Sequence, residues 1–292
     1  MTAQATHPLA GPAGPVPKRS PWWRIPLDAL VDFWRDNAMG MSGMIGFFAF
    51  LSLLPLLILL LAFAGDFSEG RVSAHAIQSL FHSVMPGLTQ YDFLHTYWDP
   101  VRHSRVATRV LGVVSLLAGS MGLHDAVDWA VNRIWESPRH RSFWINKLRG
   151  LAVIVWVIVF SVSSLGIGWL WAVVLGAIHI PVLANAGWLG LFPALILDAA
   201  IFAALYKLTP TVDIRVRPAI VAGIVGAALW EVSKVVFGWW VLTDGYNRVY
   251  GPLAASVIVM LWLWVSSMIF LYGAALSHVL QERAVAGALS ES

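Results

Sequence analysis

Three charged side chains lie inside segments that are otherwise apolar, and they are the residues of this sequence best placed to do chemistry. Glu231 and Lys234 occur within the segment Pro218–Leu242. Asp198 occurs within the segment Trp188–Tyr206. Because Lys234 follows Glu231 by three residues, both lie on one face of a helix and can form an ion pair. Carboxylate and ammonium groups in such a setting can also bind an ion or hold a polar substrate.

Two interpretations of these charges are open. A charge at the centre of a membrane costs at least about 2–3 kcal/mol, so it normally faces a protein interior or water. In the first interpretation the ion pair holds two helices together, or Lys234 extends outward to the interface. In the second, the charges form a polar site in a transport path. Asp198, at a similar depth, is the natural partner of Lys234 in either case.

Pro55 is the other residue with a specific physical consequence. It lies in the apolar run Phe47–Leu57, has no backbone N–H, and clashes with the carbonyl of Leu51. The sequence therefore predicts a bend around Leu51, within one turn before Pro55. Such a bend can serve as a hinge, and it can also be purely structural.

Motifs for other kinds of chemistry are absent from the sequence. There is no cysteine, which excludes disulfides and thiolate-bound metals. There is no phosphate-binding glycine loop, no H-E-x-x-H and no G-x-S-x-G motif. Four histidines in one predicted loop have spacings that match no metal-binding pattern: His75, His82, His95 and His103. We therefore predict no enzyme activity, no metal and no cofactor.

The composition indicates what must position these residues. The chain has 292 residues, of which 58% are hydrophobic and only 12% are charged, and its mean hydropathy is +0.71. Soluble domains are about 25% charged. Half that fraction of charged residues cannot cover the surface of a folded protein in water. A surface that faces lipid, in contrast, is apolar. The chain is therefore predicted to be a membrane protein.

Six segments are apolar over the roughly 20 residues that a helix needs to cross a membrane. They are Met39–Ala64, Val106–Leu123, Leu151–Ile178, Trp188–Tyr206, Pro218–Leu242 and Pro252–Leu280. Two further apolar stripes have helical spacing without the length to span: Ile77, Leu80, Phe81 and Val84, and, after His124-Asp125, Val127, Ala130, Val131 and Ile134. The predicted fold is an all-α polytopic bundle with six transmembrane helices plus one or two interfacial amphipathic helices.

The basic residues predict the orientation of this bundle. In a six-span arrangement thirteen Lys and Arg residues fall on the side of the two termini and five on the other side. The positive-inside rule then places both termini in the cytoplasm. The predicted organisation is a disordered, cytoplasmic segment over residues 1–35, one membrane domain over 36–282 and a cytoplasmic tail over 283–292.

Several short motifs follow one another along residues 30–282 in the order typical of a known family. They are Phe48–Leu57, Asn132–Trp135, Leu205-Tyr206 with Thr209-Pro210, Trp230-Glu231 with Lys234 and Phe237, Tyr250–Ala254, Leu261–Trp264, and Gly273-Ala274. With these motifs the chain resembles the YihY/BrkB family of bacterial inner-membrane proteins. The family commonly has a Glu after the last motif, where this chain has Ala275. Asp198 belongs to none of the motifs.

The resemblance implies a six-span, virulence-associated protein of the bacterial inner membrane, and three activities remain open. The leading hypothesis is transport or flipping of an envelope lipid-like or small amphipathic substrate, using Glu231, Lys234 and Asp198 with a hinge at Pro55. The alternative is a non-transporting scaffold that maintains the envelope. The ribonuclease label that family members have carried is least favoured, because RNA cleavage needs an acid–base or metal cluster on a basic surface. Membrane lipids are the expected partners and nucleic acid is not, while substrate, coupling ion and oligomeric state are not indicated.

Overall fold

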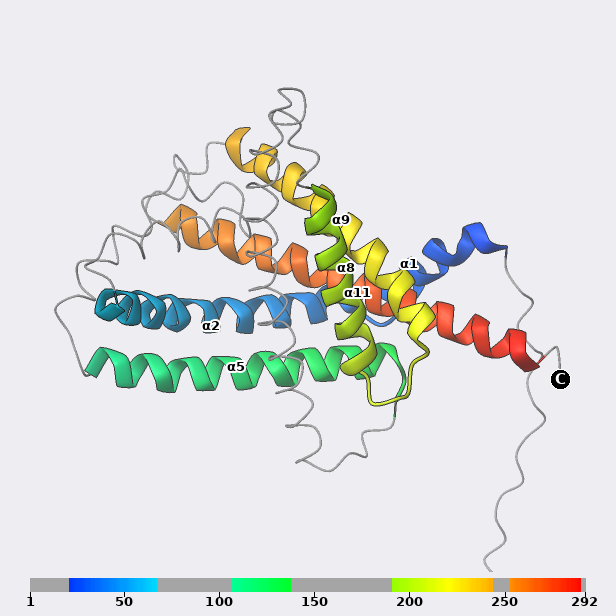
Figure 1. The fold of residues 1–292 in the computed structure, drawn as a ribbon, viewed down its shortest axis with the longest axis horizontal. Coiled ribbons are helices and arrows are strands. Elements are labelled where there is room, and N and C mark those ends of the chain that lie inside the picture. Colours follow the sequence, from blue (N-terminus) through cyan, green and yellow to red (C-terminus); the bar gives the residue numbers. More distant parts are fainter. Residues whose placement is uncertain (1–20, 68–106, 138–190, 244–252, 290–292) are drawn as a thin grey trace, which may run out of the picture.

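The protein is built from long helices that pack side by side (Figure 1). The computed structural model describes residues 21–67, 107–137, 191–243 and 253–289. The elements are the 3-10 helix η1 (Trp22–Arg24) and the α-helices α1 (Ile25–Arg35), α2 (Ala38–Phe67), α5 (Ala107–Ile134), α8 (Leu191–Leu208), α9 (Val216–Thr243) and α11 (Ala254–Leu289). No strand occurs among these residues, so the all-α class is confirmed for the described part of the chain.

Five of the six predicted spans coincide with described helices, namely α2, α5, α8, α9 and α11. The boundaries differ from the predicted ones mainly where a helix continues into polar sequence, as α5 does beyond Leu123. The third predicted span, Leu151–Ile178, and the stripe Ile77–Val84 lie outside the described residues. The number of spans therefore stays a prediction.

Helices α9 and α11 have the dimensions of membrane spans. Within the described residues, Val216–Val241 and Ser256–Ala286 are long and apolar enough to cross a membrane. Only 28% of the most apolar window of the first and 44% of that of the second is buried. The remaining apolar surface, including Val232, Val235 and Val236 on α9, points away from the protein. Lipid solvates such a surface and water does not.

The second amphipathic stripe is not a separate interfacial helix, and that prediction was wrong. Helix α5 runs without interruption from Ala107 to Ile134 and passes straight through His124-Asp125. No glycine or proline lies between Leu123 and Ile134, so nothing breaks the helix there. The stripe is instead the buried face of the last turns of α5, with Ala130 and Ile134 fully enclosed.

The disorder predicted for residues 1–35 was also wrong from Trp22 onward, where η1 and α1 begin. Pro26 lies in the first turn of α1, a position that suits its fixed φ. Ala29 and Phe33, four residues apart, form a buried face in the main core. An ion pair of 2.8 Å between Asp28 and Arg283 joins α1 to α11. A short helix with one buried face can thus be held in place by its neighbour.

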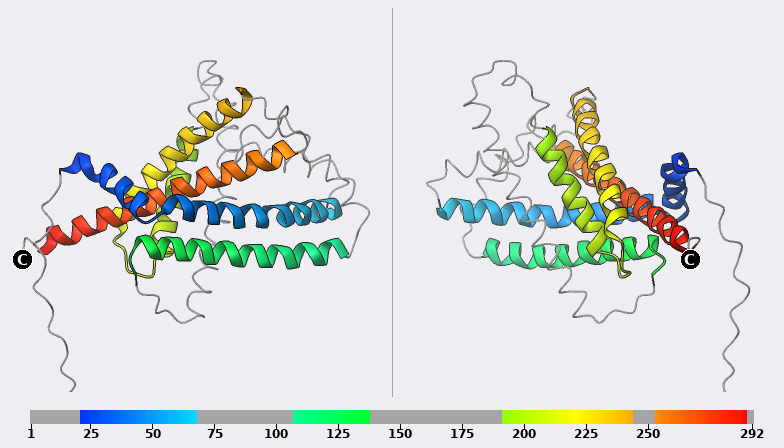
Figure 2. Two further views of the ribbon diagram at one scale, coloured as in Figure 1. Left: turned by 180° about the vertical axis from the view of Figure 1, so that it is seen from behind. Right: turned by 45° about the vertical axis from the view of Figure 1, so that its right-hand side comes forward.

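Glycines allow α2 to approach two other helices closely. Helices α2 and α5 lie side by side in all views of Figures 1 and 2. A Cβ atom at Gly119 of α5 would lie 3.0 Å from the Cα of Ser52. On the other side, a Cβ at Gly46 would lie 3.1 Å from the backbone nitrogen of Trp264 on α11. Small residues at such crossings are what packing between membrane helices requires.

Tyr206 joins three helices at the centre of the main core. Its side chain is 1% exposed and its ring stacks between Phe202 of α8 and Phe270 of α11. A Cβ at Gly273 would lie 2.0 Å from the Tyr206 hydroxyl, and one at Gly226 of α9 would lie 3.0 Å from it. The tyrosine therefore fits only because two facing helices present glycine.

The helix ends that carry basic residues gather at one end of the molecule, which we call the basal end. It comprises α1, the start of α2, the last turns of α5 and α8, the start of α9 and the last turns of α11 (Figures 1 and 2). The described basic residues at this end are Arg24, Arg35, Arg133, Lys207, Arg215, Arg217 and Arg283. Lys234 within α9 and Arg109 at the opposite end of α5 lie elsewhere.

Candidate functional site

The first candidate site is the charged pair within α9. Lys234 Nζ donates a hydrogen bond of 2.6 Å to Glu231 Oε1, three residues earlier on the helix. The Lys234 side chain is 21% exposed and that of Glu231 is 12% exposed. Both charges are therefore largely removed from the surroundings of the helix, although α9 is mostly apolar.

Asp198 of α8 joins this pair across the contact between α8 and α9. Its side chain lies close enough to Glu231 to interact with it, and the charge of Lys234 also acts on it. Two carboxyl groups can hydrogen-bond to each other only when one of them carries a proton. The Asp198–Glu231–Lys234 cluster thus brings together two acids and one ammonium group at the interface of two helices.

The backbones of α8 and α9 approach closely beside this cluster. A Cβ at Gly223 would lie 2.7 Å from the carbonyl oxygen of Ala199, the residue after Asp198, and 2.8 Å from the Cβ of Ala203. Only glycine fits at that crossing. The spacing of Gly223 and Ala227 along the sequence indicated such a contact, because small residues four apart let two helices come together.

Aromatic rings pack together at the residue next to Glu231 in the sequence. Trp230, next to Glu231, packs edge-on against Phe202 of α8 at 6.3 Å and lies 5.1 Å from the ring of Trp262 on α11. On its other side, Val235 is 72% exposed. The cluster therefore lies at the boundary between the packed protein and the apolar outer face of α9.

Pro55 lies within the continuous helix α2 and is buried. It leaves the carbonyl of Leu51 without a helical N–H partner. Just before it, the Ser52 hydroxyl donates to the Phe48 carbonyl at 2.6 Å. The same turn packs against Gly119 of α5, so the half of α2 before Pro55 is held firmly. The bend itself and the hinge role stay predictions.

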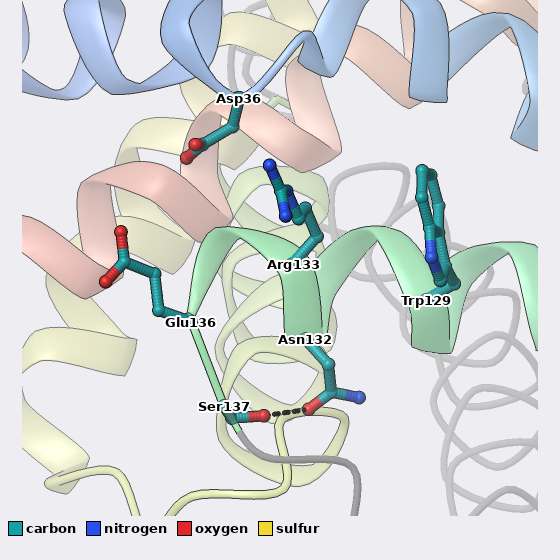
Figure 3. Close-up of a pocket in the computed structure, with 6 residues that line it drawn as sticks. All are labelled: Asp36, Trp129, Asn132, Arg133, Glu136 and Ser137. Atoms are coloured by element: carbon teal, nitrogen blue, oxygen red, sulfur yellow. Dashed lines mark hydrogen bonds between the residues drawn. The ribbon is translucent and has the colours of Figure 1, made fainter.

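A second polar site lies at the basal end, and the sequence did not predict it. It is a pocket of about 490 Å³ lined by Asp36, Trp129, Asn132, Arg133, Glu136 and Ser137 (Figure 3). Asp36 comes from the turn between α1 and α2, and the other residues come from the last turns of α5 and the turn that follows. Only the family motif Asn132–Trp135 pointed to this region, and it carried no chemical meaning by itself.

Asn132 organises the floor of this pocket. Its side-chain amide donates to the Asp128 carbonyl at 2.8 Å and to the Asp128 carboxylate at 3.0 Å. Its amide oxygen accepts from the Thr211 backbone N–H at 2.9 Å, the Thr211 hydroxyl at 2.8 Å and the Ser137 hydroxyl at 2.9 Å. Thr211 lies 79 residues away, in the connection between α8 and α9. Asn132 therefore ties this connection to the end of α5.

Charges of both signs surround the pocket. The two carboxylates share Arg35, which lies 3.7 Å from Asp36 and 3.7 Å from Glu136. The Asp36 side chain is 9% exposed, and within the described structure its Oδ2 atom has no hydrogen-bond partner. Arg133 is exposed and forms no ion pair with any described residue. In Figure 3 its guanidinium extends between Asp36 and Trp129.

Glu136 adopts a backbone conformation that normally selects glycine. Its φ is 45°, in the left-handed region. It occupies the position after the last helical turn of α5, where its N–H bonds to Arg133 at 3.2 Å and the next N–H bonds to Asn132 at 3.1 Å. This paired pattern is the usual helix stop built on glycine. A glutamate there strains the backbone and places a carboxylate in the pocket.

A model of the family described as virulence factor BrkB matches residues 29–291. The chain belongs to this family. The resemblance carried by the sequence motifs is thereby confirmed. Among the BrkB-family motifs, Tyr206 and Gly273 meet in the core, Glu231 and Lys234 form the ion pair, and Asn132 holds the pocket floor.

Curated relatives of this BrkB-family chain carry the name UPF0761 membrane protein. That of Ralstonia nicotianae is 31% identical over 203 residues, which cover 69% of this chain and 46% of the relative. That of Klebsiella pneumoniae is 30% identical over 227 residues, 74% of each chain. That of Rhodospirillum centenum is 28% identical over 261 residues, 87% of this chain and 56% of the relative.

The chain spans about half the length of several of these relatives, including 46% of the first and 40% of one from Alkalilimnicola ehrlichii. No solved structure matches the chain. The relatives and the apolar helices together identify it as a membrane protein. Ala275, where the resemblance implies a Glu, is fully buried in the main core, in a place that suits a small apolar side chain.

Proposed function

We propose that this membrane protein moves a lipid-like amphipathic substrate or a small solute across the bacterial inner membrane, with the Asp198–Glu231–Lys234 cluster on its path. The observation that carries the proposal is the third charged group. Lys234 and Glu231 already neutralise each other at 2.6 Å. A structural ion pair needs no further acid, whereas Asp198 adds one that can hold or release a proton beside them.

The cluster offers a way to couple a proton to helix movement. With one proton present, Asp198 and Glu231 attract each other and keep α8 against α9. After the proton leaves, two carboxylates face each other with one ammonium group between them, and their repulsion favours separation of the helices. A hinge at Pro55 would let α2 bend when α8 and α9 move apart. Here a local change of charge would shift the α8–α9 contact between a closed and an open state. Many protein switches work in this way.

The second candidate is a non-transporting scaffold that maintains the envelope, and the short Glu231–Lys234 contact supports it. In that case the three charges are locked together and hold α8 to α9. Neither candidate involves covalent chemistry, and we propose that the chain is not an enzyme and does not bind nucleic acid. Membrane lipids are its proposed partners.

The proposed orientation has both termini in the cytoplasm and the basal end at the cytoplasmic surface. Support comes from the basic residues that gather there, because Lys and Arg mark the cytoplasmic side of membrane proteins. Reporter fusions after Ser83 and Gly187 should score as external, and fusions after Arg141 and Thr211 as cytoplasmic. An external signal at Arg141 would contradict the orientation.

Transport can be tested with the purified full chain in vesicles that contain fluorescent phosphatidylethanolamine or phosphatidylglycerol. Quenching from outside measures how fast the labelled lipid crosses the bilayer. We expect faster crossing than in protein-free vesicles, and a loss of most of that gain in Asp198→Asn. Val235→Leu, on the exposed face of α9, is the matched control and should behave as the natural protein. Equal crossing with Asp198→Asn and the natural protein would contradict a role for the cluster.

A further inference from the structure

We propose that the pocket at the basal end binds an aminophosphate headgroup, with its primary ammonium group between Asp36 and Glu136 and its phosphate at Arg133. The pocket is separate from the Asp198–Glu231–Lys234 cluster. The inference goes beyond the proposed function, because the pocket can bind a headgroup whether or not the protein moves it.

The charges of the pocket favour a ligand that carries both signs. Figure 3 shows the Asp36 and Glu136 carboxylates on one side and the Arg133 guanidinium between them and Trp129. Both acids lie 3.7 Å from Arg35, beyond direct hydrogen-bond distance, and Arg35 is closer to Asp32, at 3.3 Å. Arg133 has no ion-pair partner among the described residues. A simple anion would meet two carboxylates and a simple cation would meet two arginines, whereas a zwitterion complements both halves.

Asp36 supplies the observation that points directly to a ligand. Its side chain is almost completely buried, lines the pocket, and leaves Oδ2 without a hydrogen-bond partner in the described part of the chain. A buried carboxylate oxygen without a partner loses the hydrogen bonds that water would have given it. A primary ammonium group has three N–H donors and can bond to Asp36 and Glu136 together. A quaternary amine such as choline has none.

The second half of the ligand is set by Arg133 and its neighbours. A guanidinium is planar and presents a fork of donors that matches two phosphate oxygens. The volume of about 490 Å³ is typical of pockets for small molecules. Trp129, partly exposed at the rim, offers an apolar wall beside the charged groups.

The position of the pocket indicates that the headgroup belongs to a lipid. Every fourth residue of α5 from Val113 to Arg133 is exposed, in a row that winds around the helix by about 40° at each step. The row begins with the apolar residues Val113, Leu117 and Met121, and ends with Asp125, Trp129 and Arg133. An acyl chain that follows this winding row past Met121 would bring its headgroup to the pocket.

The neighbouring helix α1 also fits the headgroup layer. Trp22, Trp23 and Trp34 are all exposed, and the last of them lies two residues before Asp36. Tryptophan is enriched at the depth of the headgroups, where its ring is apolar and its N–H meets polar groups. The Arg24 guanidinium lies over the Trp23 ring at 5.0 Å, which adds a cation at the same level.

Binding of radiolabelled dihexanoyl-phosphatidylethanolamine to the purified full chain in detergent tests the proposal. We expect it to bind at least about tenfold more tightly than dihexanoyl-phosphatidylcholine, which lacks ammonium donors, and dihexanoyl-phosphatidylglycerol, which lacks the cation. Equal affinity for the three lipids would overturn the proposal. Free phosphoethanolamine as competitor identifies the source of the headgroup. If free phosphoethanolamine competes weakly, the pocket binds a lipid. If it competes as strongly as the unlabelled lipid does, the pocket binds a soluble phosphoamine. Both results support the aminophosphate chemistry.

Matched variants locate the binding in this pocket. Asp36→Asn and Arg133→Gln should each weaken binding about tenfold or more, because each removes a charged hydrogen-bond partner. Asp213→Asn and Arg217→Gln alter exposed residues of the basal end outside the pocket and should bind as the natural protein does. Natural affinity in both pocket variants would overturn the proposal.

Glu136→Gly separates binding from folding. Glycine suits the φ of 45° and should raise the melting temperature, while loss of the carboxylate should weaken binding several-fold. A more stable variant that binds less tightly cannot be explained by misfolding. Unchanged affinity in this variant would show that Glu136 does not bind the ammonium group, and would overturn the proposal that this group lies between Asp36 and Glu136. The vesicle transport assay is read out independently, so a failure of transport leaves this binding result standing.

Discussion

The cluster between α8 and α9 and the pocket at the basal end differ in what satisfies their polar groups. In the cluster, the charged side chains meet one another: Lys234 bonds to Glu231 at 2.6 Å, and Asp198 contacts Glu231. In the pocket, Asn132 bonds to the backbone and hydroxyl of Thr211, and the charges stand 3.7 Å or more apart. The charged groups of the cluster interact with one another, whereas the pocket leaves polar atoms available to a ligand.

The difference follows from where each site lies along its helices. In the middle of α9 every backbone group is already bonded within the helix, so charged side chains can be neutralised only by each other. At the end of α5 the last carbonyls, the following turn and the α8–α9 connection all offer further partners. Mid-helix charges are therefore suited to exchanging a proton among themselves, and helix ends are suited to holding a ligand.

The packing around Tyr206 in the main core should show the largest response to mutation. Gly273→Ala would place a Cβ 2.0 Å from the Tyr206 hydroxyl, and Phe202 and Phe270 leave that ring no room to move. We expect a loss of about 3 kcal/mol in the free energy of unfolding, measured in detergent. Gly43→Ala, with nothing within 4 Å, is the matched control and should be neutral or stabilise α2 by up to about 1 kcal/mol. Equal effects of both variants would contradict the tight packing around Tyr206.

The hydrogen bonds of Asn132 should give the next largest effect. Asn132→Ala removes the acceptor of the Thr211 N–H and of the Thr211 and Ser137 hydroxyls, although these hydroxyls can still bond to each other. We expect stability to fall by about 2 kcal/mol. Ser120→Ala removes an exposed hydroxyl that bonds only within its own helix and should change stability little. Equal unfolding midpoints for the two variants would show that Asn132 does not hold the α8–α9 connection.

The cluster should tolerate a change that keeps its hydrogen bonds. Asp198→Asn retains a group that can bond to Glu231 and leaves the Glu231–Lys234 pair intact. We expect a change in unfolding free energy below about 1 kcal/mol, together with the loss of transport described above. A loss of stability as large as that of Asn132→Ala would place Asp198 among the structural residues and erase the contrast between the two regions.

The smallest effect concerns Asp32 of α1, beside the pocket. Burial raises its pKa above the usual 3.8, and the charges of Arg35 and His278 offset part of that rise. The folded protein then holds a proton that the unfolded chain releases, so this contribution to stability is complete below about pH 4 and is lost as the pH rises through the folded value. Asp32→Asn should therefore raise the melting temperature by about 1–2 °C at neutral pH and leave it unchanged below about pH 4. As a control, Asp213→Asn changes an exposed side chain and should not raise the melting temperature at neutral pH or below about pH 4.

The fold was predictable wherever a single helix decides the outcome. The extent of α9 follows from the apolar run Pro218–Leu242, and the pairing of Glu231 with Lys234 follows from their spacing. The continuation of α5 was missed because His124-Asp125 looks like the start of a loop, although no residue there breaks a helix. The sequence separates Asn132 from Thr211 by 79 residues. Local patterns carry no information about a contact of that kind.

The two sites also differ in how much of each could be predicted from local sequence patterns. Charges inside apolar segments are conspicuous, so Glu231, Lys234 and Asp198 could be singled out by their types alone. Asp36, Arg133 and Glu136 are ordinary charged residues at helix ends, where polar side chains are expected. Their convergence depends on how α1, α2 and α5 pack against one another, and only the structure supplies that.

The most direct test of the central claim, that the charged cluster works in transport, compares Lys234→Met with the natural protein in a strain that lacks the gene. Two quantities are measured: the abundance of the protein in the membrane and its ability to restore the lipid composition of the envelope. We predict that Lys234→Met reaches natural abundance but does not restore the lipid composition. Loss of abundance that returns when Asp198→Asn is added would contradict the claim, because it would show that the cluster serves to hold α8 and α9 together.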